Sequence, residues 1–262
     1  MKERTLPMTA PRKAVWYYLV DDARSGVVNM EIDRILAEWA EQSPRPVTWV
    51  RFYRWETPTV SLGKHQRPEE SADLNFCRRR KIPIVTRPTG GRAVFHAEEL
   101  TYAVASNQAD KFPMSSITAT YLAIAAALRR GLQLLGLETE LASGRVGSAE
   151  PSASPLSTPC FASASRHELL WKGRKLVGSA QRRLRHSFLQ QGSIPLKIDY
   201  EQMSAALGTG EKPLRSTVTS VREAAGKEIG FQALSTVLGQ GFQDIFEVPL
   251  RRTSIGSHLN SS

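Results

Sequence analysis

Residues 84–104 place a glycine-rich turn between two apolar β-type segments, and this stretch constrains the fold more than any other. Residues 84–86 are Ile-Val-Thr, which are β-branched, and residues 93–95 resume an extended apolar pattern as Ala-Val-Phe. Between them Thr89, Gly90 and Gly91 let the backbone turn and approach a neighbouring group closely, because glycine has no Cβ. The stretch therefore predicts a strand, a glycine hinge and a second strand. Taken alone, the double glycine is most simply a β-hairpin turn.

The length and composition are those of a globular protein. The chain has 262 residues, of which 41% are hydrophobic and 23% charged, which suits one large domain or two small ones. No apolar stretch is long enough to cross a bilayer, and residues 1–12 lack the apolar core of a signal peptide. We therefore expect a cytoplasmic location and no membrane association.

The two cysteines, Cys77 and Cys160, lie far apart in the sequence and do not form a disulfide framework. Neither has a second Cys or a paired His at metal-ligand spacing, so no metal site is expected. There is also no Walker loop, no dinucleotide fingerprint and no acidic cluster for a divalent metal. Each cysteine is thus either a core residue or a nucleophile, and Cys77, in a predicted helix, is most simply buried.

The formal net charge of +10 bears on the partners of the protein. The basic pairs and runs lie in different predicted elements, and no nucleic-acid-binding motif accompanies them. An acidic protein partner and an anionic cofactor explain a basic surface equally well, and a solvated surface without a specific partner is a further alternative.

Hydrophobic periodicity predicts an α/β (α+β) chain in which a sheet-forming part is followed by a small C-terminal helical appendix. The expected strands cover residues 16–20, 47–55, the start of 60–66, and 187–189. The expected helices cover residues 29–40, capped by Asn29, 68–81, and 116–135, followed by short helices over 199–207, 220–225 and 232–246. A hairpin is expected with its arms at 168–170 and 175–177, turned at Lys172-Gly173-Arg174.

Residues 143–159 are rich in Ser, Pro, Gly and Ala, which predicts a loop that leads to Cys160. Lys175 stands on the second arm of the hairpin that follows. A cationic neighbour lowers the pKa of a thiol, so that more nucleophilic thiolate is present at neutral pH. This pairing suits acyl transfer through a thioester. The alternative is a buried structural cysteine and an unrelated surface lysine.

His96, which follows the glycine hinge, also has two interpretations. It completes a Cys/His arrangement or polarises an acyl carbonyl, or it is a structural histidine whose ring nitrogens are satisfied within the core.

Several motifs occur along the chain in one order. They are Arg87-Pro-Thr-Gly-Gly-Arg-Ala-Val-Phe-His96, Glu99-Leu-Thr-Tyr102, Pro159-Cys160-Phe161, Gly173-Arg-Lys-Leu-Val-Gly-Ser-Ala-Gln181 and Leu189-Gln-Gln-Gly-Ser-Ile194, preceded by Asn29-Met30 with Asp33, Tyr53-Arg-Trp55, and Ser61-Leu-Gly63 with Gln66. Together they resemble the biotin/lipoate protein ligase superfamily from about residue 14 to 250. The resemblance implies a single catalytic domain over 14–250, with a mixed, largely antiparallel sheet flanked by helices, a helical segment from about residue 199, and flexible tails at 1–13 and 251–262.

Within the superfamily the chain is most similar to the cysteine-dependent octanoyltransferases. The positions that match their nucleophile and its pKa-lowering lysine are Cys160 and Lys175. ATP-dependent lipoate ligases usually have a third glycine where this chain has Arg92, which argues against room for an adenylate. Two positions depart from the family pattern: Ala97 stands where Asp is common, and Gln191 where His is common.

The resemblance implies that Cys160 takes octanoate from octanoyl-acyl carrier protein and passes it to a lysine of a lipoyl domain, such as that of the glycine cleavage H protein. Neither a cofactor nor nucleic acid is required. Either Lys175 or His96 accepts the proton of the attacking amine. Backbone amides around Gly90-Gly91 and Gly178-Ser179 are candidates to hold the acyl carbonyl or its oxyanion. The expected substrate-binding residues are Arg87, Thr89, Gly90, Gly91, Arg92, His96, Gly178 and Ser179.

The eight-carbon chain is expected to lie in a tunnel lined by Val85, Val94 and Leu176, and the basic surface is expected to receive acidic carrier domains. Three other functions stay open. They are octanoyl amidotransfer between lipoyl domains, ATP-dependent lipoate ligation, and non-catalytic binding of acyl carriers or nucleic acid through the basic surface.

Overall fold

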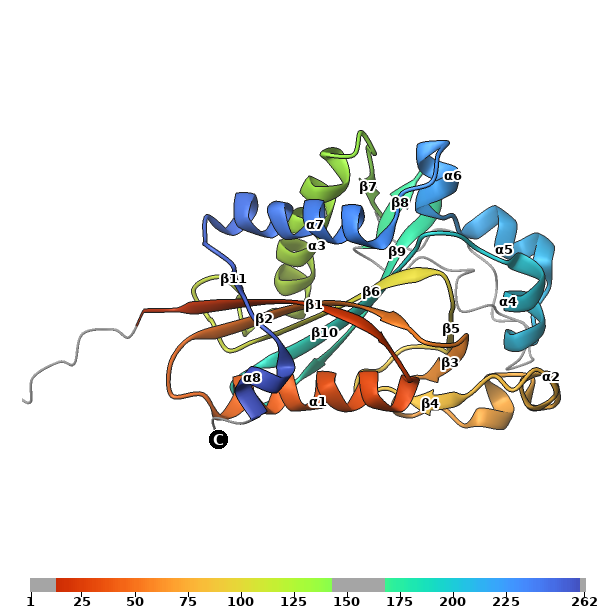
Figure 1. The fold of residues 1–262 in the computed structure, drawn as a ribbon, viewed down its shortest axis with the longest axis horizontal. Helices are drawn as coiled ribbons and strands as arrows, with labels where there is room; N and C mark the ends of the chain where they lie inside the picture. Colours follow the sequence, from red (N-terminus) through yellow and green to blue (C-terminus); the bar gives the residue numbers. More distant parts are fainter. Residues whose placement is uncertain (1–12, 143–167, 260–262) are drawn as a thin grey trace, which may run out of the picture.

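The computed structural model describes residues 13–142 and 168–259, which form a twisted sheet with helices on both faces (Figure 1). The large sheet has the strand order β11-β1-β2-β6-β10-β9-β8-β7. Strand β1 pairs in parallel with β2 and β11, and the other neighbours pair antiparallel. A second, small sheet has the order β4-β3-β5. The prediction of a mixed, largely antiparallel sheet flanked by helices is confirmed.

The strands are β1 (Val15–Arg24), β2 (Val47–Trp55), β3 (Thr59–Leu62), β4 (Ile84–Thr86), β5 (Val94–His96), β6 (Glu99–Ser106), β7 (Glu140–Leu141), β8 (Leu169–Trp171), β9 (Arg174–Arg183), β10 (Phe188–Pro195) and β11 (Arg251–Arg252). The helices are α1 (Gly26–Gln42), the 3₁₀ turn η1 (Pro68–Glu70), α2 (Leu74–Arg79), α3 (Ile117–Gln133), α4 (Tyr200–Leu207), α5 (Glu211–Thr217), α6 (Val221–Ala225), α7 (Phe231–Phe246) and α8 (Ile255–Leu259). None of these helices is long and apolar enough to cross a membrane.

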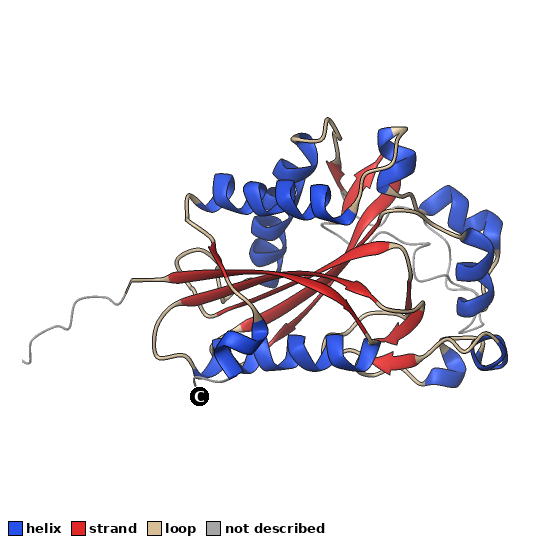
Figure 2. Ribbon diagram, in the orientation of Figure 1, coloured by secondary structure: helices blue, strands red, loops and turns tan. Residues whose placement is uncertain are grey.

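Helices cover both faces of the large sheet (Figure 2). Its central strands are buried on both faces because their side chains alternate between two cores. On β2, Val50 and Phe52 pack with α3 and α7, whereas Trp49 and Tyr53 pack with α1. Helix α7, expected as part of an appendix, therefore contributes Leu238 and other residues to the main core. This double burial explains why β2 and β6 are apolar almost throughout.

Helix α1 begins earlier than its expected cap at Asn29. Ser25 is the N-cap, and its Oγ accepts a hydrogen bond from the Val28 amide. Asn29 is instead fully buried within the helix, where its Nδ2 donates to the carbonyl oxygens of Arg24 at 3.2 Å and Arg54 at 3.0 Å. The side chain thus joins α1 to β1 and β2, a contact that helical periodicity alone does not reveal.

The stretch 84–104 is not a β-hairpin. Strands β4 and β5 both pair with β3, β4 in parallel and β5 antiparallel, so the glycine turn carries the chain across β3 from one side to the other. Strand β6 then enters the large sheet between β2 and β10. The partner of both segments lies at residues 59–62, and sequence-local turn signals do not identify it.

The hairpin of β8 and β9 is confirmed, with Lys172 and Gly173 at positive φ angles of 49° and 73°. Two successive positive φ values are those of a type I′ turn. Residues 68–81, expected as one helix, form η1 and the shorter α2. Cys77 is buried on α2, as expected.

The C-terminal helices at 199–207, 220–225 and 232–246 are confirmed within one or two residues, and α5 was not predicted. At the C-terminal end, Arg251 and Arg252 pair in parallel with Tyr17 and Tyr18 as β11, and α8 follows. Residues 251–259 thus belong to the folded structure, where a flexible tail was expected.

Candidate functional site

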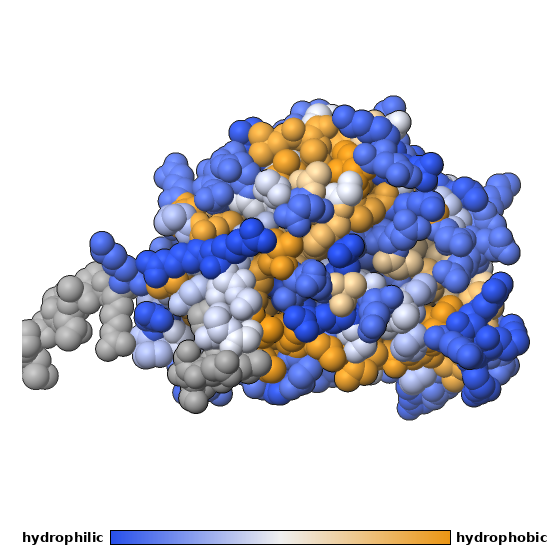
Figure 3. All heavy atoms as spheres, viewed as in Figure 1, coloured by the Kyte–Doolittle hydropathy of each residue, from blue (hydrophilic) through white to orange (hydrophobic). Residues whose placement is uncertain are grey.

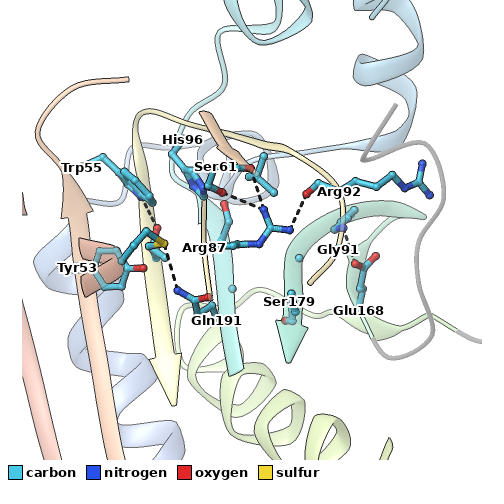
Figure 4. Close-up of a pocket in the computed structure, with 18 residues that line it drawn as sticks. Tyr53, Trp55, Ser61, Arg87, Gly91, Arg92, His96, Glu168, Ser179 and Gln191 are labelled. Atoms are coloured by element: carbon cyan, nitrogen blue, oxygen red, sulfur yellow. Dashed lines mark hydrogen bonds and ion pairs between the residues drawn. The ribbon is translucent and has the colours of Figure 1, made fainter. Parts of the chain in front are cut away.

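A cavity of about 210 Å³ lies between the small sheet, the start of α1 and the strands β2, β6, β9 and β10 of the large sheet (Figure 4). Among the described residues its wall consists of Met30, Tyr53, Trp55, Ser61, Arg87, Gly91, Arg92, Val94, His96, Thr101, Glu168, Lys175, Gly178, Ser179, Ala180, Gln191, Gly192 and Ser193. Seven of the ten predicted site residues are in this wall. Thr89 and Gly90 are not, and Cys160 lies outside the described residues.

The guanidinium of Arg87 holds the glycine loop in shape. Its Nη1 donates to the carbonyl oxygen of Ser61 at 3.0 Å and to Ser61 Oγ at 3.1 Å. Its Nη2 donates to the carbonyl oxygens of Gly90 and Arg92, each at 2.7 Å. Because Arg87 is buried and these donors point into the loop, it fastens residues 90–92 to β3.

Of the predicted pair, Gly90 and Gly91, only Gly91 needs to be a glycine. A Cβ on Gly63, in the turn after β3, would lie 1.9 Å from the carbonyl oxygen of Gly91. Gly91 itself has a φ angle of +89°, which disfavours other residues. A Cβ on Gly90 would meet no atom within 4 Å. The close approach expected from the double glycine therefore joins Gly91 to Gly63.

His96 is held on both ring nitrogens. Its Nε2 lies 2.7 Å from Ser61 Oγ and its Nδ1 lies 2.7 Å from Glu99 Oε1, while its ring stacks on Trp55 with the centroids 4.0 Å apart. The side chains of Ser61 and Glu99 thus engage both ring nitrogens of His96, and Arg87 also donates to Ser61 Oγ. This chain of hydrogen bonds matches the structural alternative for His96.

Glu99 is a buried carboxylate at the base of this chain. Burial alone would raise its pKa, but the charge of His96 and hydrogen bonds from His96, Thr101 and Ser193 outweigh it and hold the pKa of Glu99 below its usual value. The Ser193 hydroxyl donates to Oε2 at 2.7 Å. Glu99 belongs to the motifs noted in the sequence, but no role was assigned to it because its partners come from other strands.

Thr89 and Gln191 connect the glycine loop to α1. Thr89 Oγ1 donates to Gln191 Oε1 at 2.8 Å, and Gln191 Nε2 donates to Asp33 Oδ2 at 2.6 Å. Asp33 is fully buried and also forms an ion pair with Arg51 at 2.7 Å. The predicted substrate-binding residue Thr89 is thus fully buried behind the cavity wall and supports it.

Lys175 and Glu168 form a buried ion pair in the wall, with Nζ and Oε1 2.5 Å apart. The sequence analysis assigned Glu168 only to a hairpin arm. Ser179, a predicted binding residue, lines the cavity, and its Oγ lies 2.7 Å from the hydroxyl of Tyr102. Burial raises the pKa of Tyr102 to about 12, so this phenol stays protonated.

Of the three apolar residues expected to line a tunnel, only Val94 does so. Val85 packs in the core between α1 and the sheet, and Leu176 packs in the core beneath α3 and α7. The apolar lining comes instead from Met30, Tyr53 and Trp55. Strand periodicity marks these side chains as buried, but it does not tell which buried residues border a cavity.

Within residues 13–142 and 168–259, no group of three or more His, Cys, Asp or Glu side chains is placed to hold a metal ion.

The chain is similar to several proteins named octanoyltransferase LipM. It is 32% identical to that of Oceanobacillus iheyensis over 243 residues, covering 90% of this chain and 86% of the relative. It is 34% identical to that of Brevibacillus brevis over 250 residues, covering 92% and 90%.

Solved structures show the same fold at lower identity. A putative lipoate protein ligase from T. acidophilum with bound lipoic acid has a TM-score of 0.71 at 21% identity, covering 94% of this chain and 91% of that one. A lipoate-protein ligase A bound with ATP has a TM-score of 0.71 at 20% identity, covering 94% and 92%. The ligase-like fold expected from the sequence is confirmed. Since the sequence pattern of the lipoyl protein ligase A/B catalytic domain matches residues 25–243, the chain belongs to that family.

Proposed function

We propose that this protein is an acyltransferase that moves an octanoyl group from octanoyl-acyl carrier protein to a lysine of a lipoyl domain, through a thioester on Cys160. The observation that carries the proposal is the buried Lys175 in the wall of a cavity bordered by Met30, Tyr53 and Trp55. The name of the relatives, octanoyltransferase, supports the transfer of an octanoyl group.

In the first step, the thiolate of Cys160 attacks the thioester carbon of the donor. The new C–S bond forms on Cys160 as the bond to the carrier thiol breaks, and that thiol leaves as a thiolate. The ammonium of Lys175 favours ionisation of the Cys160 thiol. Its own charge is compensated by Glu168, which makes the buried cation tolerable.

In the second step, the neutral ε-amine of the acceptor lysine attacks the acyl carbon, an amide forms, and Cys160 leaves as the thiolate. The amine proton passes to the carboxylate of Glu168 in its pair with Lys175. We assign the proton to this pair because both ring nitrogens of His96 are already engaged with Ser61 and Glu99.

The decisive experiment is incubation of the purified protein with octanoyl-acyl carrier protein in the absence of ATP. Intact-mass spectrometry is expected to show one octanoyl group on Cys160, which discharges when apo H protein is added. Cys160→Ala is expected to show no adduct and no transfer. Cys77→Ala is the matched control, because Cys77 lies on α2 with its side chain buried in a hydrophobic cluster, so its removal should not affect acylation.

Three results would contradict the proposal. They are the absence of an adduct on the wild type, full transfer by Cys160→Ala, and transfer that requires ATP, the last of which would point to a ligase. A donor preference for an octanoylated lipoyl domain over the carrier protein would indicate the amidotransferase.

A further inference from the structure

The cavity has an open side and a closed end. Gly91 and Arg92 in its wall are exposed, and Ser179 is half-buried. At the other end Tyr53 has no exposed surface and Trp55 only 7%. Figure 4 shows Glu168, Gly91 and Arg92 on one side of the cavity, with Tyr53 and Trp55 on the opposite side. Since Lys175 is paired with Glu168, the chemistry proposed above belongs to the open side, and an acyl tail points to the closed end.

The closed end suits an apolar tail although polar atoms are present there. The indole nitrogen of Trp55 donates to Thr101 Oγ1 at 2.7 Å, and the hydroxyl of Tyr53 donates to Asp33 at 2.8 Å. Ser193 is bound to Glu99. Because these groups are hydrogen-bonded to one another, they need no water or polar ligand group, and an alkyl chain can lie against them without leaving them unpaired.

Most of this end is rigid. The Tyr53 ring is held by its hydroxyl and by the guanidinium of Arg51, 3.9 Å from the ring centroid. Trp55 is fixed between its hydrogen bonds and the ring of His96. Gly192 has no room for a side chain, since a Cβ there would lie 2.2 Å from the ring of Tyr102. These three positions therefore give the closed end a fixed shape.

Met30 differs from these neighbours. Met30 is 8% exposed, and its flexible thioether accepts a weak hydrogen bond from Gln191 Nε2, which lies 3.7 Å from Sδ. It belongs to the apolar cluster between α1 and the sheet, so a shorter side chain would extend the cavity into apolar surroundings. The backbone at the start of α1 is closely packed, because a Cβ on Gly26 would lie 2.9 Å from Thr59, 3.1 Å from Trp55 and 3.2 Å from Val85.

We propose that Met30 sets the longest acyl chain that the site accepts. The proposal rests on the acyl transfer proposed above and names its specificity-determining residue. Removing the thioether lengthens the space available to the tail, and a larger rigid side chain at the same position shortens it.

The test compares Met30→Ala, Met30→Phe and the wild type with acyl carrier protein thioesters of six, eight, ten and twelve carbons. Met30→Ala is expected to raise the ratio of kcat/KM for decanoyl over octanoyl by about tenfold or more. Tenfold is the low end of the discrimination that one methylene gives in an apolar pocket. Met30→Phe is expected to shift the preference to hexanoyl by a similar factor. Val27→Ala, on the same helix but 69% exposed and outside the cavity wall, is the matched control and should keep the wild-type profile.

Chain-length profiles of the two Met30 variants that coincide with the wild type would overturn the proposal. Thermal unfolding identifies a variant that has not folded, and the milder truncation Met30→Val then replaces it, with a shift of the preference towards decanoyl expected. Calorimetric binding of free saturated fatty acids of the same lengths supplies a readout that does not depend on transfer. Binding that shifts with Met30 in a protein without transferase activity would reject the proposed function alone, whereas normal octanoyl transfer with unshifted profiles would reject the role of Met30 alone.

Discussion

Gly63 lies beside the glycine loop and Gly90 lies within it, and the packing around the two differs. Alanine at Gly63 would place its Cβ against the backbone of Gly91, which cannot move without disturbing the carbonyls bound by Arg87. We expect Gly63→Ala to lower the free energy of unfolding by about 1–3 kcal/mol, the range for overpacking, and to reduce octanoyl transfer. Gly90→Ala, with no atom within 4 Å of its Cβ, should stay within about 0.5 kcal/mol of the wild type. Urea unfolding and transfer rates of the two variants check this, and equal effects would contradict it.

The lowered pKa of Glu99 predicts how the free energy of unfolding changes in acid. A carboxyl group whose folded pKa lies below its unfolded value of about 4.3 contributes stability that is complete above that value. The contribution is lost as the pH falls through the folded pKa, because the unfolded chain then binds the proton more readily. Glu99→Gln has no such carboxyl group. The difference in unfolding free energy between wild type and Glu99→Gln, measured by urea unfolding from pH 6 to 3, should therefore shift in favour of the variant as the pH falls. A constant difference would contradict this assignment.

At the scale of single elements, the start of α1 depends more on a buried amide than on its cap. Ser25→Ala removes one exposed capping bond and should cost about 1 kcal/mol of unfolding free energy. Asn29→Ala removes a fully buried side chain, leaves the carbonyl oxygens of Arg24 and Arg54 without this donor and removes an acceptor of Arg51, so we expect a larger loss of about 3 kcal/mol. Urea unfolding of both variants measures the order of the two effects. The reverse order would mean that Asn29 acts as a cap.

The elements also show where sequence patterns succeed. The helix α3 and the hairpin of β8 and β9 were predicted because periodicity, caps and turn residues are local signals. The partner of β4 and β5 was not predicted. Strand β3 lies more than twenty residues upstream, and its pairing with both strands depends on tertiary contacts that no local sequence signal reports. Residues 251–252 gave no strand signal for the same reason, since two arginines form β11 only through the free edge offered by β1.

At the scale of the molecule, the net charge of +10 is not gathered in one element. On the face drawn in Figure 3, hydrophilic residues spread over the whole surface with apolar patches between them. If the donor and acceptor are acidic domains, the charge acts on encounter with them and not on chemistry. We expect kcat/KM for octanoyl-acyl carrier protein to fall about tenfold between low salt and roughly 0.5 M salt, because charges are screened over a few ångströms there. An uncharged octanoyl thioester of a small thiol should be unaffected. Equal salt effects on the two donors would contradict the charge argument.

The sequence by itself determined the family-level architecture and seven of the residues in the cavity wall, because these follow from periodicity, turn chemistry and motifs held in one order. Only the tertiary structure decided how these residues are placed and which groups they contact. It placed Thr89 behind the wall, paired Lys175 with Glu168, made Arg87 a support for the loop, and brought Met30 to the closed end. The physical reason is that hydrogen bonds, ion pairs and cavity walls join groups from distant strands, whereas a sequence pattern reports only the burial of each residue within its own element.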